Sequence, residues 1–305
     1  MTKTIVTAAA LTLFALPALG AAAPKPTTGR AAIHGVDYYY EVHGKGEPLL
    51  LLHGGLLSTD SFVPAMPAFT KGRQVIAVDL QGHGRTTLGN RPIRCEAIAD
   101  DIDTLLGQLG RTQVDVLGYS FGGCVALRLA LQHPDRVRRL VLVSTVFADD
   151  GWYADMRVQQ KQVGAAMAPM MAKTPIGEAY KAVAPKPDDF PRLLDGMGDW
   201  MRQKYDWSAE VPRLKMPVML IFGDADMIRP EHQMKFYQLL GGGLRDAGWN
   251  RENMPKNRLA VLPDMTHYEM FASSRAAETA MPFLNGQIGG AKSTAEPSKA
   301  QASKK

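Results

Sequence analysis

The chain has little of what disulfide-rich and metal-binding proteins need. It holds two cysteines, Cys95 and Cys124, in 305 residues, so at most one disulfide can form. Each lies in a segment of helical pattern, and we expect both to be buried as small hydrophobic side chains. No cluster of Cys, His and carboxylate residues has metal-ligand spacing, and no Gly-x-Gly-x-x-Gly follows a strand pattern. Nothing in the sequence calls for a cofactor.

Long hydrophobic runs are missing after the first 20 residues. Lys3 precedes an apolar stretch at residues 5–19, which is too short to favour a membrane-spanning helix, and small residues follow at 18–23. This is the pattern of a secretory signal peptide, predicted over residues 1–22. We therefore expect export to the periplasm or the extracellular space and no stable membrane insertion. Residues 23–30 are interpreted as a flexible linker.

The chain has no excess of acidic residues, and its net charge is +5. This positive charge lies at the two ends of the chain and does not create a basic face on the fold. Lys3, Lys25 and Arg30 supply three positive charges, and the tail at 287–305 supplies three more from four lysines and one glutamate. Residues 31–286 are left at about −1, so we expect no nucleic-acid partner. The tail is rich in Ala, Ser and Lys and is predicted to be disordered.

What is present is an ordinary globular composition, with 46% hydrophobic and 21% charged residues. Strand and helix patterns alternate through the middle of the chain, which implies a parallel sheet. We expect strands near 36–43, 48–53, 74–79, 113–118, 138–144, 217–222 and 258–262, and helices near 94–109, 121–132, 230–240 and 270–285. An insertion at 241–257 holds several glycines and Trp249, which suggest a mobile loop with Trp249 as its one anchor.

A segment rich in methionine and aromatic residues interrupts the alternation at about 146–216. Within it, Met167, Met170 and Met171 share one helical face. One interpretation is packing onto the main domain. The other is a cap whose adaptable methionines line an apolar substrate pocket, and both can hold at once. With Leu56, these three methionines are the predicted substrate contacts.

The most informative motif is Gly118-Tyr119-Ser120-Phe121-Gly122. An apolar strand pattern leads into it and a helical pattern follows directly. A Gly-x-Ser-x-Gly between strand and helix is the signature of a nucleophile elbow, a sharp turn that holds the serine hydroxyl above the sheet. The glycines are needed because strand and helix approach so closely that larger side chains would collide. Ser120 is the predicted nucleophile.

A serine hydroxyl needs a base to accept its proton, and the base needs an acid to orient it. After such an elbow, the acid and then the histidine follow in the chain. Of the seven histidines, only His232 and His267 lie far enough beyond Ser120. His232 falls in the first turn of a helical pattern and is interpreted as solvated. His267 follows a strand and a turn, where catalytic groups of open α/β sheets collect, and is the predicted base.

The acid should come from the loop after the preceding strand, where Asp224 and Asp226 compete. Asp224 directly follows the turn glycine, and its side chain is expected to bond to its own backbone. Asp226 lies farther along the loop and can reach a histidine across the top of the sheet. We favour Asp226, with Asp224 as the alternative.

The oxyanion formed during acyl transfer needs two preorganised N–H donors. One should be the N–H of Phe121, at the positive end of the helix after the nucleophile. The second should come from the loop after the leucine-rich strand at 49–52, where the N–H of Gly55 is predicted and that of Leu56 is the alternative. His53 is expected to brace this loop by hydrogen bonds.

At this point the sequence resembles the α/β-hydrolase superfamily over about residues 31–286, most closely its esterase, lactonase and perhydrolase-like members. The matching blocks, in the family's order, are Leu52-His53-Gly54-Gly55, Val78-Asp79-Leu80-Gln81-Gly82-His83-Gly84, Gly118-Tyr119-Ser120-Phe121-Gly122-Gly123, Phe222-Gly223-Asp224-Ala225-Asp226 and His267. The resemblance implies a mostly parallel, doubly wound α/β sheet of about eight strands, a helical cap, and a Ser120–His267–Asp226 triad.

We therefore predict an exported serine hydrolase that cleaves carboxylic esters or lactones with a fairly apolar acyl or alcohol part. Ser120 excludes the aspartate nucleophile of related dehalogenases and epoxide hydrolases. A C–C bond hydrolase or a perhydrolase would use the same triad, so both stay open. The rival from another class is a non-catalytic small-molecule binding protein, but such a protein has no physical need for three triad residues in register.

Overall fold

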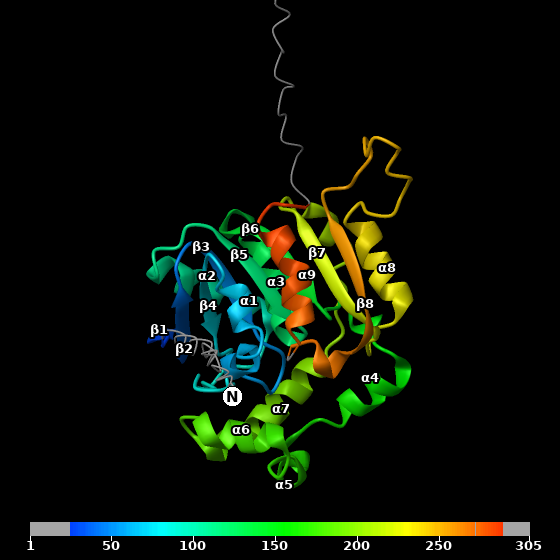
Figure 1. Cartoon of the computed structure of the whole chain (residues 1–305). Helices are drawn as coiled ribbons and strands as arrows, with labels where there is room; N and C mark the ends of the chain where they lie inside the picture. Colours follow the sequence, from blue (N-terminus) through cyan, green and yellow to red (C-terminus); the bar gives the residue numbers. More distant parts are fainter. Residues whose placement is uncertain (1–24, 272, 289–305) are drawn as a thin grey trace, which may run out of the picture.

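The centre of the molecule is one eight-stranded sheet with the strand order β1-β2-β4-β3-β5-β6-β7-β8 (Figure 1). The structure is a computed structural model that describes residues 25–271 and 273–288. β1 and β2 run antiparallel to their neighbours, and the other neighbouring strands pair in parallel. The mostly parallel sheet predicted from the sequence is thus confirmed. The strands are β1 (Thr27–Ile33), β2 (Val36–Gly44), β3 (Glu47–Leu52), β4 (Arg73–Val78), β5 (Val114–Tyr119), β6 (Val137–Val143), β7 (Val218–Ala225) and β8 (Arg258–Thr266).

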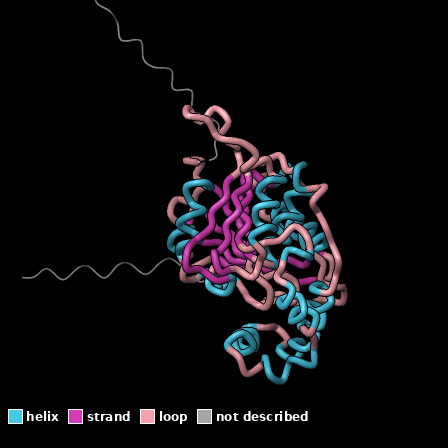
Figure 2. Tube along the Cα trace, turned by 90° about the vertical axis from the view of Figure 1, so that its right-hand side faces the viewer, coloured by secondary structure: helices cyan, strands magenta, loops and turns pink. Residues whose placement is uncertain are grey.

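Helices cover both faces of the sheet, which lies between them in Figure 2. They are α1 (Met66–Phe69), α2 (Cys95–Gln108), α3 (Phe121–Gln132), α4 (Ala154–Lys161), α5 (Ala168–Met171), α6 (Pro175–Val183), α7 (Phe190–Met201), α8 (Pro230–Leu239) and α9 (Ser274–Leu284). Side chains alternate between the two faces of each strand. Leu50 and Leu52 of β3 therefore join the hydrophobic cluster under α2, α3 and α8, whereas Leu49 and Leu51 join the cluster under α1 and α9.

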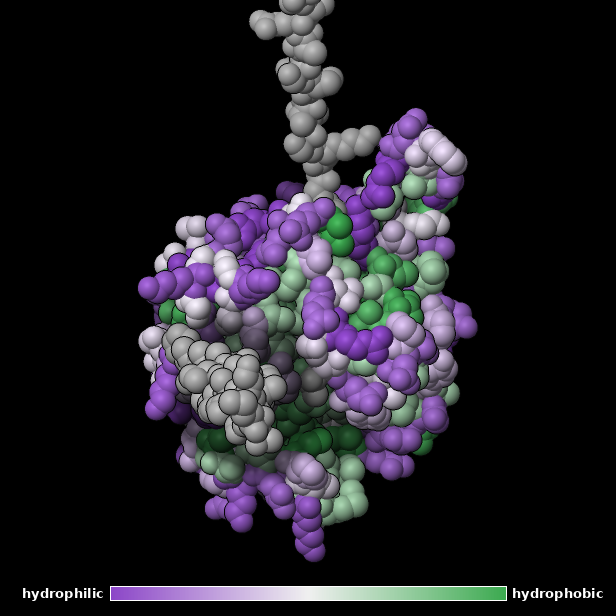
Figure 3. Space-filling model, viewed as in Figure 1, coloured by the Kyte–Doolittle hydropathy of each residue, from purple (hydrophilic) through white to green (hydrophobic). Residues whose placement is uncertain are grey.

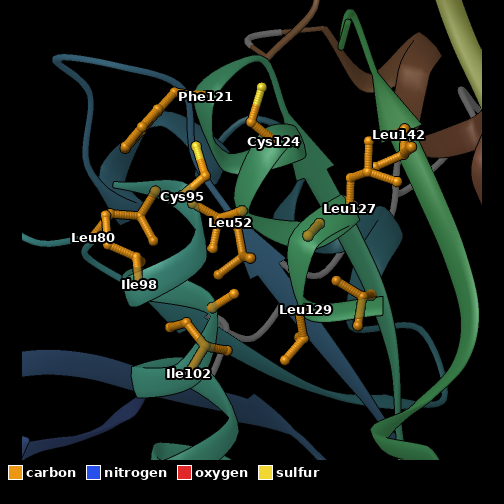
Figure 4. Packing of buried hydrophobic residues seen from close by; sticks show 14 of the residues in the cluster. Leu52, Leu80, Cys95, Ile98, Ile102, Phe121, Cys124, Leu127, Leu129 and Leu142 are labelled. Carbon is orange, nitrogen blue, oxygen red and sulfur yellow. The ribbon is translucent and has the colours of Figure 1, made fainter. Parts of the chain in front are cut away.

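The contact between α2 and α3 fixes the helix that follows the elbow. Cys95 of α2 and Cys124 of α3 lie in this packed layer, near Phe121 and Leu52 (Figure 4). Both cysteines are buried free thiols, as predicted. Because close-packed interiors leave little room for movement, α3 is held firmly behind Ser120.

The prediction of a flexible linker at residues 23–30 is wrong for residues 27–30. Thr27–Arg30 belong to β1, whose seven residues pair antiparallel with β2 at the edge of the sheet. Only Ala31 and Ile33 of this strand are buried, so the apolar alternation that marks a half-buried strand is nearly absent. Backbone hydrogen bonding to β2, which composition does not reveal, makes the strand.

The turn predicted at residues 263–266 is instead an irregularity within β8. The pairing of β7 with β8 shifts in register between Gly223 and Ala225, and Asp264 has a left-handed φ of 56°. Pairing then resumes between Ala225 and Thr266. The residues that follow these two, Asp226 and His267, consequently leave the sheet side by side.

Helices α4 to α7 lie between β6 and β7 in the chain, at the end of the sheet toward which the parallel strands point (Figure 1). This is the segment where the sequence predicts a cap at about 146–216. The predicted signal peptide at 1–22, and all of the predicted tail except residues 287 and 288, lie outside the described residues. Within the described residues, no helix is long and apolar enough to cross a bilayer.

The insertion at 241–257 stands out from the body of the molecule at the upper right of Figure 3. Trp249 is 98% exposed, so the prediction that it anchors the loop is wrong. The anchor is Asn257, which is buried at the loop's base. Its side chain accepts a hydrogen bond from the Val218 N–H at 2.7 Å and donates one to the Leu240 carbonyl at 2.5 Å. The loop tip has no comparable fixed point in the core.

Candidate active site

Ser120 occupies a sharp turn between β5 and α3. Its φ of 53° and ψ of −115° are strained for a residue with a side chain, and such outliers gather at functional sites. The Ser120 N–H donates to the Val143 carbonyl of β6 at 2.9 Å, which ties the turn to the neighbouring strand. The six residues of β5 before it are all buried, whereas Ser120 is partly exposed. The turn therefore lifts the hydroxyl out of the core.

The glycines of the motif have the steric role expected from the sequence. A Cβ on Gly118 would lie 2.4 Å from the Gly122 carbonyl oxygen. A Cβ on Gly122 would lie 2.3 Å from the carbonyl oxygens of both Leu52 and His53. Gly122 thus lets the start of α3 touch the backbone at the end of β3, which brings the elbow beside the 53–56 loop.

We expect Gly118→Ala to lower the free energy of unfolding by about 1–3 kcal/mol, because the added methyl cannot avoid backbone atoms. Gly107→Ala in α2 is the matched control, since its Cβ would meet nothing closer than 4.0 Å. That variant should be neutral or gain roughly 0.5–1 kcal/mol from helix propensity. Denaturant unfolding measures both, and equal losses would contradict the close-approach argument.

His267 joins the nucleophile to a buried carboxylate. Its Nε2 lies 3.0 Å from Ser120 Oγ, and its Nδ1 lies 2.8 Å from Asp226 Oδ1. The side chains of His267 and Asp226 are buried, so this contact is shielded from water. The structure thus brings together the three residues that the sequence selects, in the order and spacing that a serine nucleophile needs.

Asp226 is held by two further donors. Ser144 Oγ donates to Asp226 Oδ2 at 2.5 Å, and the Ile228 N–H donates to Oδ1 at 3.3 Å. Ser144 directly follows β6 and has a left-handed φ of 49°. Sequence reasoning missed it, although its place at the carboxyl end of a parallel strand is a usable signal.

Two aromatic side chains position the histidine. The Tyr119 hydroxyl donates to the His267 carbonyl at 2.7 Å, and its ring centroid is 5.4 Å from the imidazole. Trp152 packs edge-on against the same imidazole at 5.8 Å. Nothing in the sequence marks Tyr119 or Trp152 for this task, because the contact joins segments more than 100 residues apart.

The two competing residues lie away from this group. Asp224 is exposed, and its Oδ1 accepts from the Met265 N–H at 3.2 Å, so it supports the β8 irregularity. The N–H groups of Asp264 and Met265 lower the pKa of Asp224. His232 is buried, contrary to the solvated position expected for it, and its ring stacks on Phe147 at 4.0 Å. Burial lowers the pKa of His232 to about 4.

The segments that carry the candidate oxyanion donors lie next to each other. The position of a Cβ on Gly55 would be 3.7 Å from Phe121 Cβ, so the two segments are in contact. In the described part of the chain, no group accepts a hydrogen bond from the N–H of Gly55, Leu56 or Phe121. Unpaired N–H groups at a helix start and its neighbouring loop can hold an oxyanion.

Buried polar side chains shape the loop that carries Gly55. His53 Nδ1 lies 2.7 Å from the Gly54 carbonyl and Nε2 accepts from the Leu80 N–H at 3.0 Å, which is the bracing role expected for it. Burial lowers the pKa of His53 to about 4. Burial, and then repulsion from His53, lowers the pKa of His83 to about 3. Both imidazoles are therefore neutral near pH 7.

Asp79 ties the same loop to the next one. Its two oxygens accept from the N–H groups of Thr59 and Arg85, each at 2.7 Å. Burial raises the pKa of Asp79, against the effect of these N–H groups. The aspartate of the block at 78–84 is thus a structural brace.

An apolar pocket of about 240 Å³ lies beside Leu56, the residue after Gly55, although neither Ser120 nor His267 lines it. Its apolar lining comes from the loop after β3, from α6 and from the segment after His267, and includes Leu56, Leu57, Ile176, Ala179, Val183 and Phe271. Leu56 follows Gly55, and the Phe271 ring lies 5.6 Å from the ring of Tyr119, which precedes Ser120. A larger pocket of about 270 Å³ is polar, and none of the predicted site residues lines it.

Leu56 lines the apolar pocket as expected, whereas Met167, Met170 and Met171 do not. The predicted helical face is broken: Met167 ends a short 3₁₀ turn, and α5 has four residues. Met170 is 62% exposed, and Met171 packs on the core. The methionine nearest the oxyanion loop is Met197 of α7, whose terminal carbon lies 2.9 Å from the position of a Cβ on Gly55.

Residues 25–271 and 273–288 contain no cluster of three or more His, Cys, Asp or Glu side chains that could hold a metal ion.

Comparisons with known proteins agree with this fold. A family profile described as alpha/beta hydrolase fold matches residues 47–205, more than half of the chain. The 2-hydroxymuconate semialdehyde hydrolase of Pseudomonas sp. (strain CF600) is 37% identical over an alignment of 128 residues that covers 39% of this chain. The match spans 44% of that relative, so less than half of its length is represented.

Solved structures show the same fold. The enol-lactonase of Burkholderia xenovorans LB400 superposes with a TM-score of 0.64 at 21% identity, covering 84% of this chain and 100% of that one. Carboxylesterase CesB of Bacillus subtilis superposes with a TM-score of 0.64 at 19% identity, covering 87% of this chain and 93% of that one.

Proposed function

We propose a function from one premise: the chain belongs to the α/β-hydrolase fold family. Its hydrolase-named relatives support a hydrolase that acts on a small molecule. Within that class, we propose a serine hydrolase that cleaves carboxylic esters or lactones with an apolar part. The observation that carries the proposal is the continuous contact from Ser120 Oγ through His267 to Asp226, at 3.0 and 2.8 Å.

In the first half of the reaction, Ser120 Oγ attacks the substrate carbonyl while its proton passes to His267 Nε2. Asp226 accepts from Nδ1, which keeps Nε2 free to take the proton and stabilises the imidazolium that results. The N–H groups of Gly55 and Phe121 hold the oxygen as it becomes negative. His267 then returns the proton to the leaving alkoxide, and an ester bond to Ser120 remains.

In the second half, water attacks the acyl-enzyme with His267 again as the base. The same two N–H groups stabilise the second oxyanion. The proton returns to Ser120 as the acid product leaves. In a lactone the leaving alcohol stays attached to the acyl group, so the product is a single hydroxy acid.

The proposal is tested with purified protein and p-nitrophenyl acetate or butyrate. Turnover that a serine-directed fluorophosphonate abolishes supports it. Absence of hydrolysis by correctly folded protein, over a panel of esters and lactones, would overturn it in favour of a binding protein.

We expect kcat/KM to rise with acyl length while the chain fills the apolar pocket. Each buried CH₂ adds about 0.8 kcal/mol, which is up to roughly fourfold per carbon. Acetate, butyrate, hexanoate and octanoate esters provide the series. A flat or falling series from acetate onward would remove the pocket from substrate binding.

Two variants link that series to the pocket. Ile176→Trp should shorten the preferred chain, because the indole occupies space that α6 now lines with a smaller side chain. Met170→Ala is the control, since Met170 is exposed and does not line the pocket. Its chain-length profile should match that of the unmodified protein.

A C–C bond hydrolase is the second candidate. The observation that favours it is the sequence identity to the 2-hydroxymuconate semialdehyde hydrolase, a relative whose name gives a semialdehyde, and not an ester, as the substrate. A perhydrolase would use the same triad as well. Parallel assays with esters, with a semialdehyde of that class, and with acetate plus hydrogen peroxide rank the three by kcat/KM.

We also propose that the protein is exported. The support is the pattern of Lys3, the apolar stretch at 5–19 and the small residues that follow. The mature chain should begin near Ala21 or Ala23 and occur in an extracytoplasmic fraction. N-terminal sequencing that finds residues 1–19 retained in native material would contradict export.

A further inference from the structure

The loop at 241–257 presents apolar side chains that the rest of the molecule does not cover. Trp249 is 98% exposed, Leu244 is 66% exposed and Met254 is 39% exposed. Tryptophan is rarely left in water to this extent, because its large ring gains free energy wherever it is buried. We call these three residues the apolar loop tip.

The loop also carries three exposed cations, Arg245, Arg251 and Lys256. The Lys256 ammonium donates to the Lys215 carbonyl at 2.8 Å. The loop's two carboxylates are engaged by the loop itself. Asp246 accepts from the Gly248 N–H at 2.7 Å, and Glu252 accepts from the Asn250 N–H at 3.0 Å. Both carboxylates keep their charge in these contacts, so three cations against two carboxylates give the loop a net charge of about +1.

The lysine-rich end of the chain leaves from the same edge of the sheet. The loop's base is bonded to the first residue of β7, through Asn257 and Val218. Leu284 accepts from the side chain of Arg73, the first residue of β4. The base of the loop and Leu284 therefore both lie at the amino ends of parallel strands. Ser120 follows the carboxyl end of β5, so it lies at the other end of the sheet (Figure 1). Residues 289–305 follow and contain four lysines and one glutamate.

We propose that this edge docks on an anionic lipid bilayer, with the apolar loop tip entering the interface and the three loop cations facing the head groups. Tryptophan prefers the membrane–water interface, where its ring is buried and its N–H stays hydrated. Juxtaposed basic residues add electrostatic attraction. A protein partner fits less well, because three side chains on a projecting loop offer far less than the roughly 800 Å² per partner of a stable interface.

The proposal is independent of the reaction at Ser120. It places the site at the opposite end of the sheet from the bilayer, open to substrates in the aqueous phase. Docking of this kind is peripheral and reversible, since one apolar loop and a basic patch together give moderate affinity.

The test is sedimentation of the processed full chain with vesicles of phosphatidylcholine alone, or of phosphatidylcholine mixed with phosphatidylglycerol. We expect binding to the mixed vesicles, weaker binding to the neutral ones, and release by salt. Trp249→Ser should weaken binding by roughly tenfold or more. Replacing Arg245, Arg251 and Lys256 by glutamine should weaken it by about fivefold per charge.

Val158→Ser is the matched control, because Val158 is 57% exposed on α4 near the other end of the molecule. It should bind like the unmodified chain, and ester hydrolysis in solution should be the same in all variants. The proposal is overturned if the unmodified chain does not bind mixed vesicles at low salt. It is also overturned if Trp249→Ser binds as well as Val158→Ser, or if removing residues 289–305 abolishes binding that Trp249→Ser leaves intact. Self-association that Trp249→Ser abolishes, without vesicle binding, would assign the tip to a second copy.

Discussion

Replacing Ser120 by alanine should lower kcat for ester hydrolysis by ~10⁴–10⁶, since the residues of a triad act as a unit. In the proposed reaction the Ser120 hydroxyl oxygen forms the acyl bond, and its proton passes to His267 Nε2, which lies 3.0 Å away. KM should change little because the pocket lining stays in place. Steady-state kinetics on p-nitrophenyl butyrate measures the effect.

Ser58→Ala is the matched control for this variant. Ser58 lines the apolar pocket, and its hydroxyl oxygen caps a short turn by accepting from the Asp60 N–H at 3.3 Å. Its loss should leave kcat within about twofold, because the Ser58 hydroxyl takes no part in the proposed proton transfer, and any effect of the altered pocket lining should fall on KM. A fluorophosphonate adduct should be found by mass spectrometry on Ser120 alone. An adduct on another residue, or full turnover by Ser120→Ala, would refute the nucleophile assignment.

Asp226→Asn should lower kcat by on the order of 10⁴, because an amide no longer holds His267 in the tautomer that leaves Nε2 unprotonated. In the native protein the Asp226 carboxylate accepts hydrogen bonds from Ser144 Oγ and from the Ile228 N–H. The NH₂ group of the asparagine would face one of these donors and could not accept its hydrogen bond. The variant should remain folded, and circular dichroism checks this. Single-turnover kinetics then assigns the loss to chemistry.

Asp224→Asn distinguishes the two neighbouring aspartates. Asp224 is exposed and braces β8 through the Met265 N–H. Its replacement should cost less than about 1 kcal/mol of stability and leave kcat nearly unchanged. If the two variants exchanged their effects, Asp224 would be the acid and the β7–β8 geometry would have been misread.

Local patterns carried enough information for most of the fold and the site. The elbow is marked by glycines whose absence of a Cβ is a steric necessity, and the order of Asp226 and His267 follows from the order of β7 and β8. Each of these residues directly follows a parallel strand, so its place at one edge of the sheet is a consequence of chain direction.

Features that depend on long-range contact were not predictable in the same way. β1 is held by pairing with β2 and has only two buried side chains, so its sequence lacks a strand pattern. Ser144 matters only because β6 and β7 are neighbours in the sheet. The methionines at 167–171 match a helical spacing, yet their side chains lie along elements too short to present one face to the pocket.

The buried histidines have a consequence for behaviour in acid. The pKa of His53 falls from 6.5 to about 4, that of His83 to about 3 and that of His232 to about 4. In the unfolded chain each would bind a proton near pH 6.5, so protons favour unfolding as the pH falls from 6.5 toward 4. Each histidine then removes up to about 1.4 kcal/mol of stability per pH unit. Asp79, whose pKa burial raises, works in the opposite direction.

The free energy of unfolding, measured with denaturant, should therefore be clearly lower at pH 5 than at pH 7, and an unchanged value would show that these imidazoles are not held neutral in the fold. The acid limb of a pH–rate profile would then record loss of the native population together with protonation of the site. Activity measured below pH 6 has to be normalised to the folded fraction before any titration is assigned to the catalytic base. In acid, activity would therefore fall in part because the fold itself is lost.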